Sequence, residues 1–326
     1  MTPEGIRMSE LRLEAGAQPI RYPSHTSHYH TYQQRKARYE GLYRPGSVHE
    51  RILNLLIAHG ADLEICDRTG RSPLICAVAN GAVGVAENLL SRGADVNAAG
   101  ALPSALFHAA ANGDSRMVQL LLAYKASTLP RQAGCPWSPL WIAARNGHFN
   151  VVETLLSYRI PTPSSPQREF RTWEPLLDAA KRGHARVVQI LIAYHKQAWP
   201  GVPLGQQGLF WAAYGGWERV FHAFLDAGVP LGGLCRGIEA MPILSAAVMG
   251  RNTVIVNHIL SKGVDVNARD GYKWSAMNWA VWTKNRELED VLRTHGAEDN
   301  NRDWLAGGPW PHHPFQDCVP AIRVVR

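Results

Sequence analysis

Clusters of histidine, cysteine and carboxylate side chains are the features of this 326-residue chain that could bind a metal or perform catalysis. His25, His28 and His30 lie close together, but no Cys or carboxylate stands at ligand spacing beside them. The histidine pair at 312–313 with Cys318 makes no fuller set. Because structural zinc sites use four placed ligands, we expect both groups to be solvated and predict no metal and no cofactor.

Catalytic constellations are also missing from the sequence. His148 and His184 each follow a Gly, but a general base needs an adjacent nucleophile and an orienting partner, and neither recurs beside them. Asp178 precedes Lys181 at a spacing typical of an ion pair on a helix surface. The phosphate-binding patterns G-x-x-x-x-G-K-[ST] and G-x-G-x-x-G are absent as well. The sequence therefore predicts a protein that is not an enzyme, with structural roles for both histidines.

The charge balance favours acidic partners. The chain has 34 Lys and Arg against 27 Asp and Glu, a net charge of +7. Part of this charge lies in the run Gln34-Arg35-Lys36-Ala37-Arg38. This run could be a nuclear-localisation signal or a phosphate contact, or it could be the solvent-exposed face of a helix.

Cysteine usage and hydropathy predict the compartment. The 5 cysteines lie far apart without a C-x-x-C pair, which indicates free thiols in a reducing compartment. The first 23 residues lack the apolar core of a signal peptide, and no stretch approaches 18 uninterrupted apolar residues. We therefore expect an intracellular protein, cytoplasmic or nuclear, that does not enter membranes.

A repeated pattern organises most of the chain. Each copy has a small polar residue, often Pro, an aliphatic residue and an Ala pair before a Gly, and then continues into an aliphatic helix such as residues 151–156. A fixed period in this range predicts stacked two-helix units, an all-α solenoid, instead of one globular core. The anchors of the copies are Ser72, Ser104, Ser138, Glu174, Gln207, Met241 and Ser275, spaced by 32 to 36 residues.

The clearest unit spans residues 67–97. Ser72 can accept a hydrogen bond from a free amide at a helix start, and Pro73 fits the first helical position because its missing N–H costs nothing there. Gly81 permits a tight reversal between two helices, and Gly93 tolerates the positive φ that ends the second. The unit is therefore predicted to be a helix, a tight turn and a second helix.

This unit resembles the ankyrin repeat, whose signature runs Asp-x-x-Gly-x-Thr-Pro-Leu-His-x-Ala-Ala-x-x-Gly and closes with Gly-Ala-Asp-Val-Asn-Ala. Residues 93–97 and 263–268 both follow the closing phrase. The resemblance covers about residues 46–299, with about seven complete repeats and a degenerate first copy at residues 52–62. It implies an ankyrin-repeat solenoid with hairpin-like fingers. We expect residues 1–45 to be a flexible basic arm, with a helix near Thr31–Tyr43 completing the first repeat, and residues 300–326 to be an extended tail.

Some copies depart from the family pattern. The Gly expected after the second helix is Lys125, Arg159 and His195 in three central copies. Because a non-Gly residue at positive φ costs on the order of 1 kcal/mol, we expect these loops to take another path. The last copy has Lys284 in place of Gly and Arg293 in place of Leu, which indicates a polar cap on a terminal repeat.

The resemblance also implies which residues contact a partner. In ankyrin repeats a concave groove is lined by the residue before the Thr position and by the two residues before the mid-repeat Gly. The side chains at such positions that suit an interface are Trp137, Trp173, Arg145, Lys181, Arg182, Tyr214, Trp274 and Arg71. Two readings stay open, a contact role or packing against the neighbouring finger. We expect Trp211 and Trp279 to lie on the core side and to be structural.

These observations predict a non-enzymatic protein–protein interaction module, a scaffold or regulator that binds partners through its groove. The aromatic and cationic groups favour a protein partner with an acidic and partly apolar segment. The alternatives are a nucleic-acid-associated regulator that uses the basic arm and groove, and an accessory factor in an enzyme pathway.

Overall fold

The computed structural model describes most of the repeat region. The described residues are 34, 36, 48–68, 70–98, 103–129, 138–158, 170–232, 234–235 and 241–298. They fall into two compact units, Met1–Pro200 and Gly201–Arg326.

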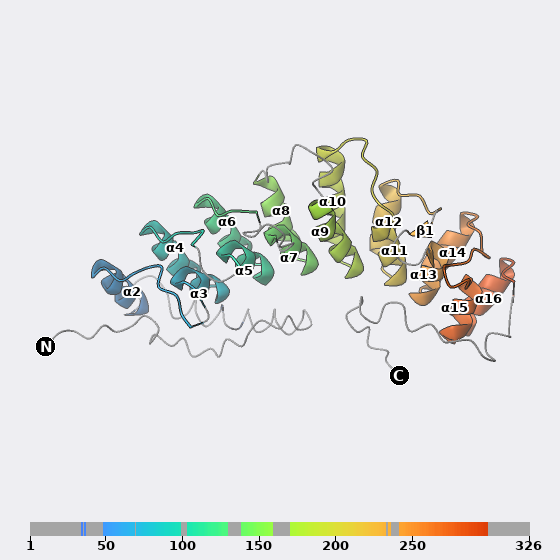
Figure 1. Ribbon diagram of the computed structural model, residues 1–326, viewed down its shortest axis with the longest axis horizontal. Coiled ribbons are helices and arrows are strands. Elements are labelled where there is room, and N and C mark those ends of the chain that lie inside the picture. Colours follow the sequence, from blue (N-terminus) through green and yellow to red (C-terminus); the bar gives the residue numbers. More distant parts are fainter. Residues whose placement is uncertain are drawn as a thin grey trace. The chain divides into compact units, whose positions relative to one another are not determined.

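The first unit is a series of helix pairs. Its helices are α2 (Val48–Ala58), α3 (Pro73–Ala79), α4 (Val83–Ser91), α5 (Ala105–Asn112), α6 (Ser115–Ala123), α7 (Pro139–Arg145), α8 (Phe149–Ser157), α9 (Phe170–Lys181) and α10 (Ala185–Ala198). The first helices α3, α5, α7 and α9 pack side by side in chain order, and the second helices α4, α6, α8 and α10 form a parallel row (Figure 1).

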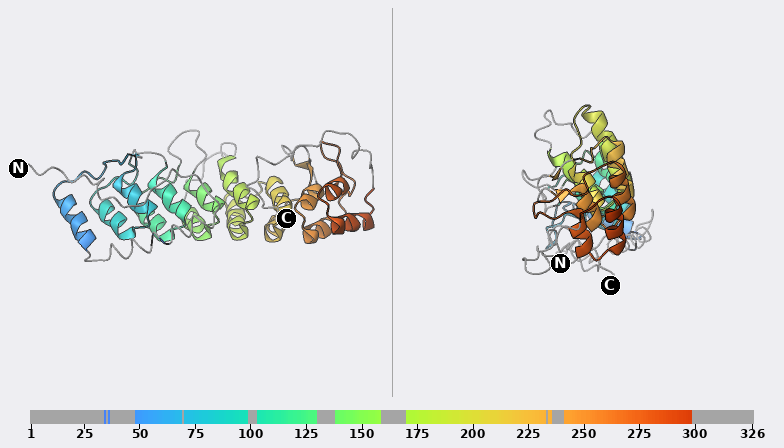
Figure 2. Two further views of the ribbon diagram at one scale, coloured as in Figure 1. Left: turned by 90° about the horizontal axis from the view of Figure 1, so that it is seen from below. Right: turned by 90° about the vertical axis from the view of Figure 1, so that its right-hand side faces the viewer.

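The second unit repeats the same arrangement. Its elements are α11 (Gln207–Tyr214), α12 (Glu218–Asp226), β1 (Leu234–Cys235), β2 (Met241–Pro242), α13 (Ile243–Met249), α14 (Thr253–Ser261), α15 (Ala276–Trp282) and α16 (Arg286–Thr294). Helices α11, α13 and α15 pack in order, and β1 pairs with β2 as a short antiparallel hairpin. Figure 2 shows the helix pairs of each unit following one another along the chain. The predicted stacking of two-helix units is confirmed within each unit.

Capped helix starts fix the register of the repeats. The hydroxyls of Ser72, Ser104 and Ser138 accept hydrogen bonds from the backbone N–H three residues later, at 3.4, 3.2 and 3.0 Å. Each hydroxyl satisfies one of the amides that a helix N-terminus leaves without a partner. Pro73 and Pro139 then occupy the first helical position. The role predicted for Ser72 and Pro73 is confirmed.

Small side chains let the first helices approach closely. The Ala pairs 109–110, 143–144 and 179–180 are all fully buried, at 0% exposure. The second helices complete the core with aliphatic residues such as Val151, Val152 and Leu155. Because each pair buries its surface mainly against its neighbours, the core of the first unit is a continuous layer between its two rows of helices.

Three copies begin at other residues than the pattern predicted. In the fifth copy the N-cap is Gln206, so the predicted anchor Gln207 is the first residue of α11. Met241 lies in β2 and Pro242 is the N-cap of α13, so the sixth copy is shifted by one residue. Consistently, the left-handed residue of its central turn is Arg251, at φ 54°, and not Gly250. In the fourth copy α9 already begins at Phe170, so the predicted anchor Glu174 lies inside the helix.

Lys125 corrects the expectation for the loops that lack Gly. It adopts the left-handed conformation itself, with φ 63°. The surrounding bonds explain why, since Lys125 N–H donates to Leu122 O at 2.9 Å and Ala126 N–H to Leu121 O at 3.0 Å. These bonds satisfy the last carbonyls of α6 and outweigh the backbone strain. His195 does take another path, because it lies within α10, and Arg159 falls outside the described residues.

Replacing Lys125 by Gly is expected to stabilise the protein. The substitution relieves the left-handed strain but adds backbone entropy to the unfolded chain, so we expect a net gain of roughly 0.5 kcal/mol in the free energy of unfolding. Lys262, a C-cap with φ −91°, provides the matched control. Lys262→Gly should destabilise by roughly 0.5–1 kcal/mol. Urea unfolding of both variants checks the prediction, and a loss of stability in Lys125→Gly would contradict it.

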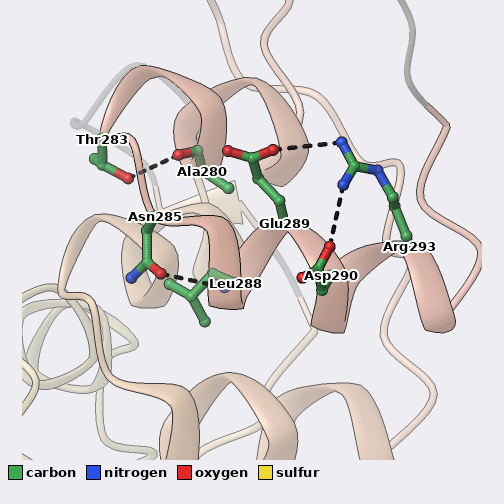
Figure 3. A network of polar contacts seen from close by, with 7 residues as sticks. All are labelled: Ala280, Thr283, Asn285, Leu288, Glu289, Asp290 and Arg293. Carbon is green, nitrogen blue, oxygen red and sulfur yellow. Dashed lines mark hydrogen bonds and ion pairs between the residues drawn. The ribbon is translucent and has the colours of Figure 1, made fainter.

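The last repeat ends in a polar network on α16 (Figure 3). Arg293 Nη2 lies 3.3 Å from Glu289 Oε2, and its Nη1 lies 3.2 Å from Asp290 Oδ1. Asn285 caps the helix by accepting the N–H of Leu288 at 3.2 Å. Of the two polar residues predicted to cap the terminal repeat, Arg293 forms these local pairs on the outer helix. Lys284 lies in the preceding turn and adopts the left-handed conformation itself, with φ 55°.

Several predictions fall on residues outside the described ranges, namely the basic arm of residues 1–45 apart from two positions, and the tail of residues 300–326. Gln34 and Lys36, the two described positions of the arm, are helical. The domain boundaries therefore stay predictions. Among the described residues, no helix is long and apolar enough to cross a membrane.

Candidate functional site

The C-terminal ends of α7 and α9 bring together a cluster of charged and aromatic side chains. Arg145, the last residue of α7, places its Nη1 3.3 Å from Asp178 Oδ2 on α9. The Arg145 guanidinium carbon also lies 5.0 Å from the ring centroid of Trp141, one turn earlier on α7. The aromatic face and the carboxylate hold the guanidinium between two neighbouring repeats.

The pairing of Asp178 corrects the sequence prediction. The spacing suggested a local ion pair with Lys181, whereas the carboxylate accepts a hydrogen bond from Arg145, which lies 33 residues away. The reason is the packing of α7 beside α9, which places equivalent turns of two repeats next to each other. The contact therefore joins two repeats, which a local spacing cannot predict.

Positive charges outnumber negative ones in this cluster. Lys181 is the last residue of α9 and Arg182 follows it in the turn, so both lie at the same end of the repeat stack as Arg145. Burial and the nearby Arg145 charge lower the pKa of Arg182, and Asp178 partly offsets this effect. We define the candidate site as Trp141, Arg145, Asp178, Lys181 and Arg182. These residues comprise three cations and one carboxylate, so the site has a net positive formal charge.

His148 and His184 stabilise the turns beside the site. Each His Nε2 lies 3.1 Å from a carbonyl of the preceding repeat, Ala111 O for His148 and Arg145 O for His184. Burial lowers the pKa of both rings, and the Arg182 charge lowers that of His184 further. Neutral imidazoles that donate Nε2–H to these carbonyls fit this environment. The geometry supports the structural role predicted for both histidines.

Glycines make room for these two histidines. A Cβ on Gly113 would lie 2.6 Å from His148 Nδ1, and one on Gly147 would lie 2.7 Å from His184 Nδ1. Both glycines also have positive φ, 72° and 76°. These two positions therefore require Gly for two reasons. The backbone turn has a positive φ, and the His ring of the next repeat occupies the space that a Cβ would need.

The other predicted contact residues have different surroundings. Trp137 lies outside the described residues, and Trp173 lies in α9 with a side chain that is not described. Arg71 is half-buried in the first unit, where its charge acts on His108. Trp274 is half-buried in the second unit and packs 4.7 Å from the Trp279 ring.

Tyr214 requires a correction. Its side chain is only 6% exposed and lies edge-on to Trp211, with ring centroids 5.7 Å apart. A side chain this buried packs within its own unit and offers little surface to a partner. Trp211 and Trp279 are buried as well, at 7% and 0% exposure, which confirms their predicted structural role.

Trp141 is the site residue that the sequence analysis missed. It occupies the position where the ankyrin signature has His. A usable signal was present, because an aromatic residue four positions before an Arg on a helix places the ring beneath the guanidinium.

Within the described ranges, the structure shows no cluster of side chains that could bind a metal and no paired cysteines. No group of three or more His, Cys, Asp or Glu side chains there could hold a metal ion. The two cysteines with described side chains, Cys66 and Cys76, are free, the first exposed and the second half-buried. Burial raises the pKa of the Cys76 thiol to about 11, so at neutral pH it is protonated.

Interlocked helix pairs, left-handed turns and capped first helices define a class of protein, the helical repeat solenoids. The family model for ankyrin repeats, which has three copies, matches residues 46–99 and 106–203. The crystal structure of the human ASB11 ankyrin repeat domain is similar in fold, with a TM-score of 0.55 at 21% sequence identity, over 70% of this chain and 99% of that one. No curated protein matches the sequence. The comparisons therefore show an ankyrin-repeat fold, with the family model matching residues 46–99 and 106–203, and the total of about seven complete copies stays a prediction.

Proposed function

We propose that the protein is a non-enzymatic binding module, a scaffold or regulator that holds a protein partner at the candidate site. Ankyrin repeats are generally protein–protein interaction modules and generally not enzymes, which gives the broad class. The observation that supports a particular place is the cluster of Trp141, Arg145, Lys181 and Arg182 at adjacent helix ends in one unit.

The chemistry of the site favours an acidic and partly apolar segment. Three cations and one carboxylate give the site a surplus of positive charge that attracts carboxylates. Trp and Arg are also the residues that most often dominate interface energies, because they combine a large apolar area with hydrogen bonding. Trp137 and Trp173 belong to the same proposed surface by their positions in the repeats.

A matched pair of charge reversals tests this proposal. Peptides selected by display on the wild-type protein should be rich in Asp and Glu together with a hydrophobic residue. Lys181→Glu should weaken their binding by about tenfold, because it removes an attraction and adds a repulsion of similar size. Lys196→Glu makes the same charge change on the exposed side of α10, in the same repeat, and should leave the affinity nearly unchanged. Titration calorimetry measures both.

Two outcomes would overturn the proposal. Equal losses in Lys181→Glu and Lys196→Glu would mean that only the overall charge matters and that no local site exists. Selected peptides without acidic residues would remove the chemical basis of the site. A Trp137→Ala/Trp173→Ala variant with native circular dichroism then tests whether these tryptophans extend the surface, since loss of peptide binding is expected if they contact the partner.

A further inference from the structure

Asp114 is an unusual residue at a repeated position. Within the described residues, the N-cap positions of the second helices are Ala82, Asp114, His148, His184, Trp217, Asn252 and Asn285. Asp114 is the one acid in this set. Its Oδ1 accepts the Met117 N–H at 3.2 Å, as Asn252 and Asn285 do for their own helices. Capping therefore explains a polar residue here but not its negative charge.

The second oxygen of Asp114 has a distant partner. Lys36 Nζ lies 2.8 Å from Asp114 Oδ2, across 78 residues of sequence. The Asp114 side chain is 2% exposed and that of Lys36 is 22% exposed. Because a carboxylate this deep is unfavourable without a counter-charge, the lysine compensates for its burial.

The position of Asp114 connects this contact to the candidate site. Asn146 Nδ2 and His148 Nε2 of the next repeat lie 2.9 and 3.1 Å from Ala111 O, three residues before Asp114. Arg145 directly precedes Asn146. The lysine therefore sits at the turn that is joined by hydrogen bonds to the turn beside Arg145.

We propose that Asp114 is the docking site for Lys36 of the chain's own basic N-terminal segment. Lys36 lies at the turn of the second complete repeat, where its Nζ pairs with Asp114 Oδ2, while Oδ1 accepts the Met117 N–H. Gln34 and Lys36, the two described residues of this segment, are both helical. The sequence left two roles open for this basic run, a nuclear-localisation signal or a solvent-exposed helix face. Docking of Lys36 gives the run a third role, as an intramolecular ligand that shields the turn next to the candidate site.

Limited trypsin digestion of the full-length protein tests the docking. Trypsin cleaves after Arg35, Lys36 and Arg38, and cleavage follows the population of the undocked segment. Asp114→Asn retains a good N-cap and removes the charge. In this variant, cleavage at the three sites should be about fivefold faster than in wild type at low salt. Wild-type cleavage should also accelerate at 0.5 M salt, where ion pairs are screened.

Two further variants make the test decisive. Glu153→Gln removes one exposed acid from α8 of the same unit and should cleave at the wild-type rate. Lys36→Gln should speed cleavage after Arg35 and Arg38 as Asp114→Asn does, since it removes the other half of the pair. Equal rates in wild type and Asp114→Asn, or no effect of Lys36→Gln, would overturn the docking. Protection that rises with protein concentration would assign the segment to a second copy of the chain and overturn the intramolecular site.

Discussion

Trp279→Ala is expected to destabilise the second unit by about 3–5 kcal/mol, the cost of removing a large aromatic side chain from a closed core. Trp279 is 0% exposed on α15, and its ring lies 4.7 and 5.6 Å from those of Trp274 and Trp282. Its Nε1–H donates to Asp270 Oδ2 at 2.8 Å. The substitution therefore leaves a cavity and also removes one of the donors of a buried carboxylate.

The loss of stability should extend to the hairpin-like finger whose backbone Asp270 binds. Asp270 Oδ1 accepts the N–H groups of Tyr272 and Trp274, both at 2.9 Å, so one carboxylate links the finger to the core of the last repeat. Because the stability of a repeat array is largely a sum over neighbouring repeats, the last repeat should open first. Hydrogen exchange should show faster exchange in α15 and α16, while the amides of α3 to α8 keep their wild-type rates.

Two variants separate the cost of the cavity from the cost of the lost hydrogen bond. Trp279→Phe keeps most of the apolar volume and loses the Nε1 donor, so it should cost about 1–3 kcal/mol. Trp282→Ala on the same helix removes a half-buried ring and should cost clearly less than Trp279→Ala, in line with the smaller area that it buries. Urea unfolding measures all three. Equal effects of Trp279→Ala and Trp282→Ala would show that Trp279 has no special place in the core.

The features that could be predicted from sequence are those that each repeat encodes locally. Ser72 and Pro73 specify a helix start by themselves, and the alternation of small and aliphatic residues specifies which faces pack. For the same reason Trp279 could be placed in the core from its position within a first helix. Local rules are sufficient here because every repeat meets nearly the same neighbours.

The features that could not be predicted depend on contacts between repeats. Asp178 pairs with Arg145 instead of Lys181 because stacking brings a residue from 33 positions away to the same helix end. Lys125 keeps a left-handed turn because the carbonyls of α6 must be satisfied, whichever residue stands there. The contact of Lys36 with Asp114, 78 residues apart, has no sequence signal beyond a charged residue at a capping position.

The first unit should lose stability as the pH falls from 7 to 5, because it buries a neutral histidine. His108 is 6% exposed, and burial, with a smaller contribution from the Arg71 charge, lowers its pKa to about 4. In the unfolded chain the ring has its ordinary pKa of about 6.5. The folded pKa is the lower one, so the stabilisation is present above pH 6.5 and is lost as the unfolded state takes up the proton between pH 6.5 and 4.

The expected loss attributable to His108 is about 2 kcal/mol between pH 7 and pH 5. His108→Gln cannot take up this proton, so its free energy of unfolding, although lower at pH 7, should fall by about 2 kcal/mol less over the same range. Urea unfolding of both proteins at the two pH values gives the difference, in which titrations common to both cancel. Proton NMR provides an independent check, since the His108 ring signal should not shift between pH 7 and 5. An imidazole that titrates near pH 6.5 in the folded protein, or equal pH dependences of the two proteins, would contradict the prediction and would mean that water reaches the interface between α3 and α5.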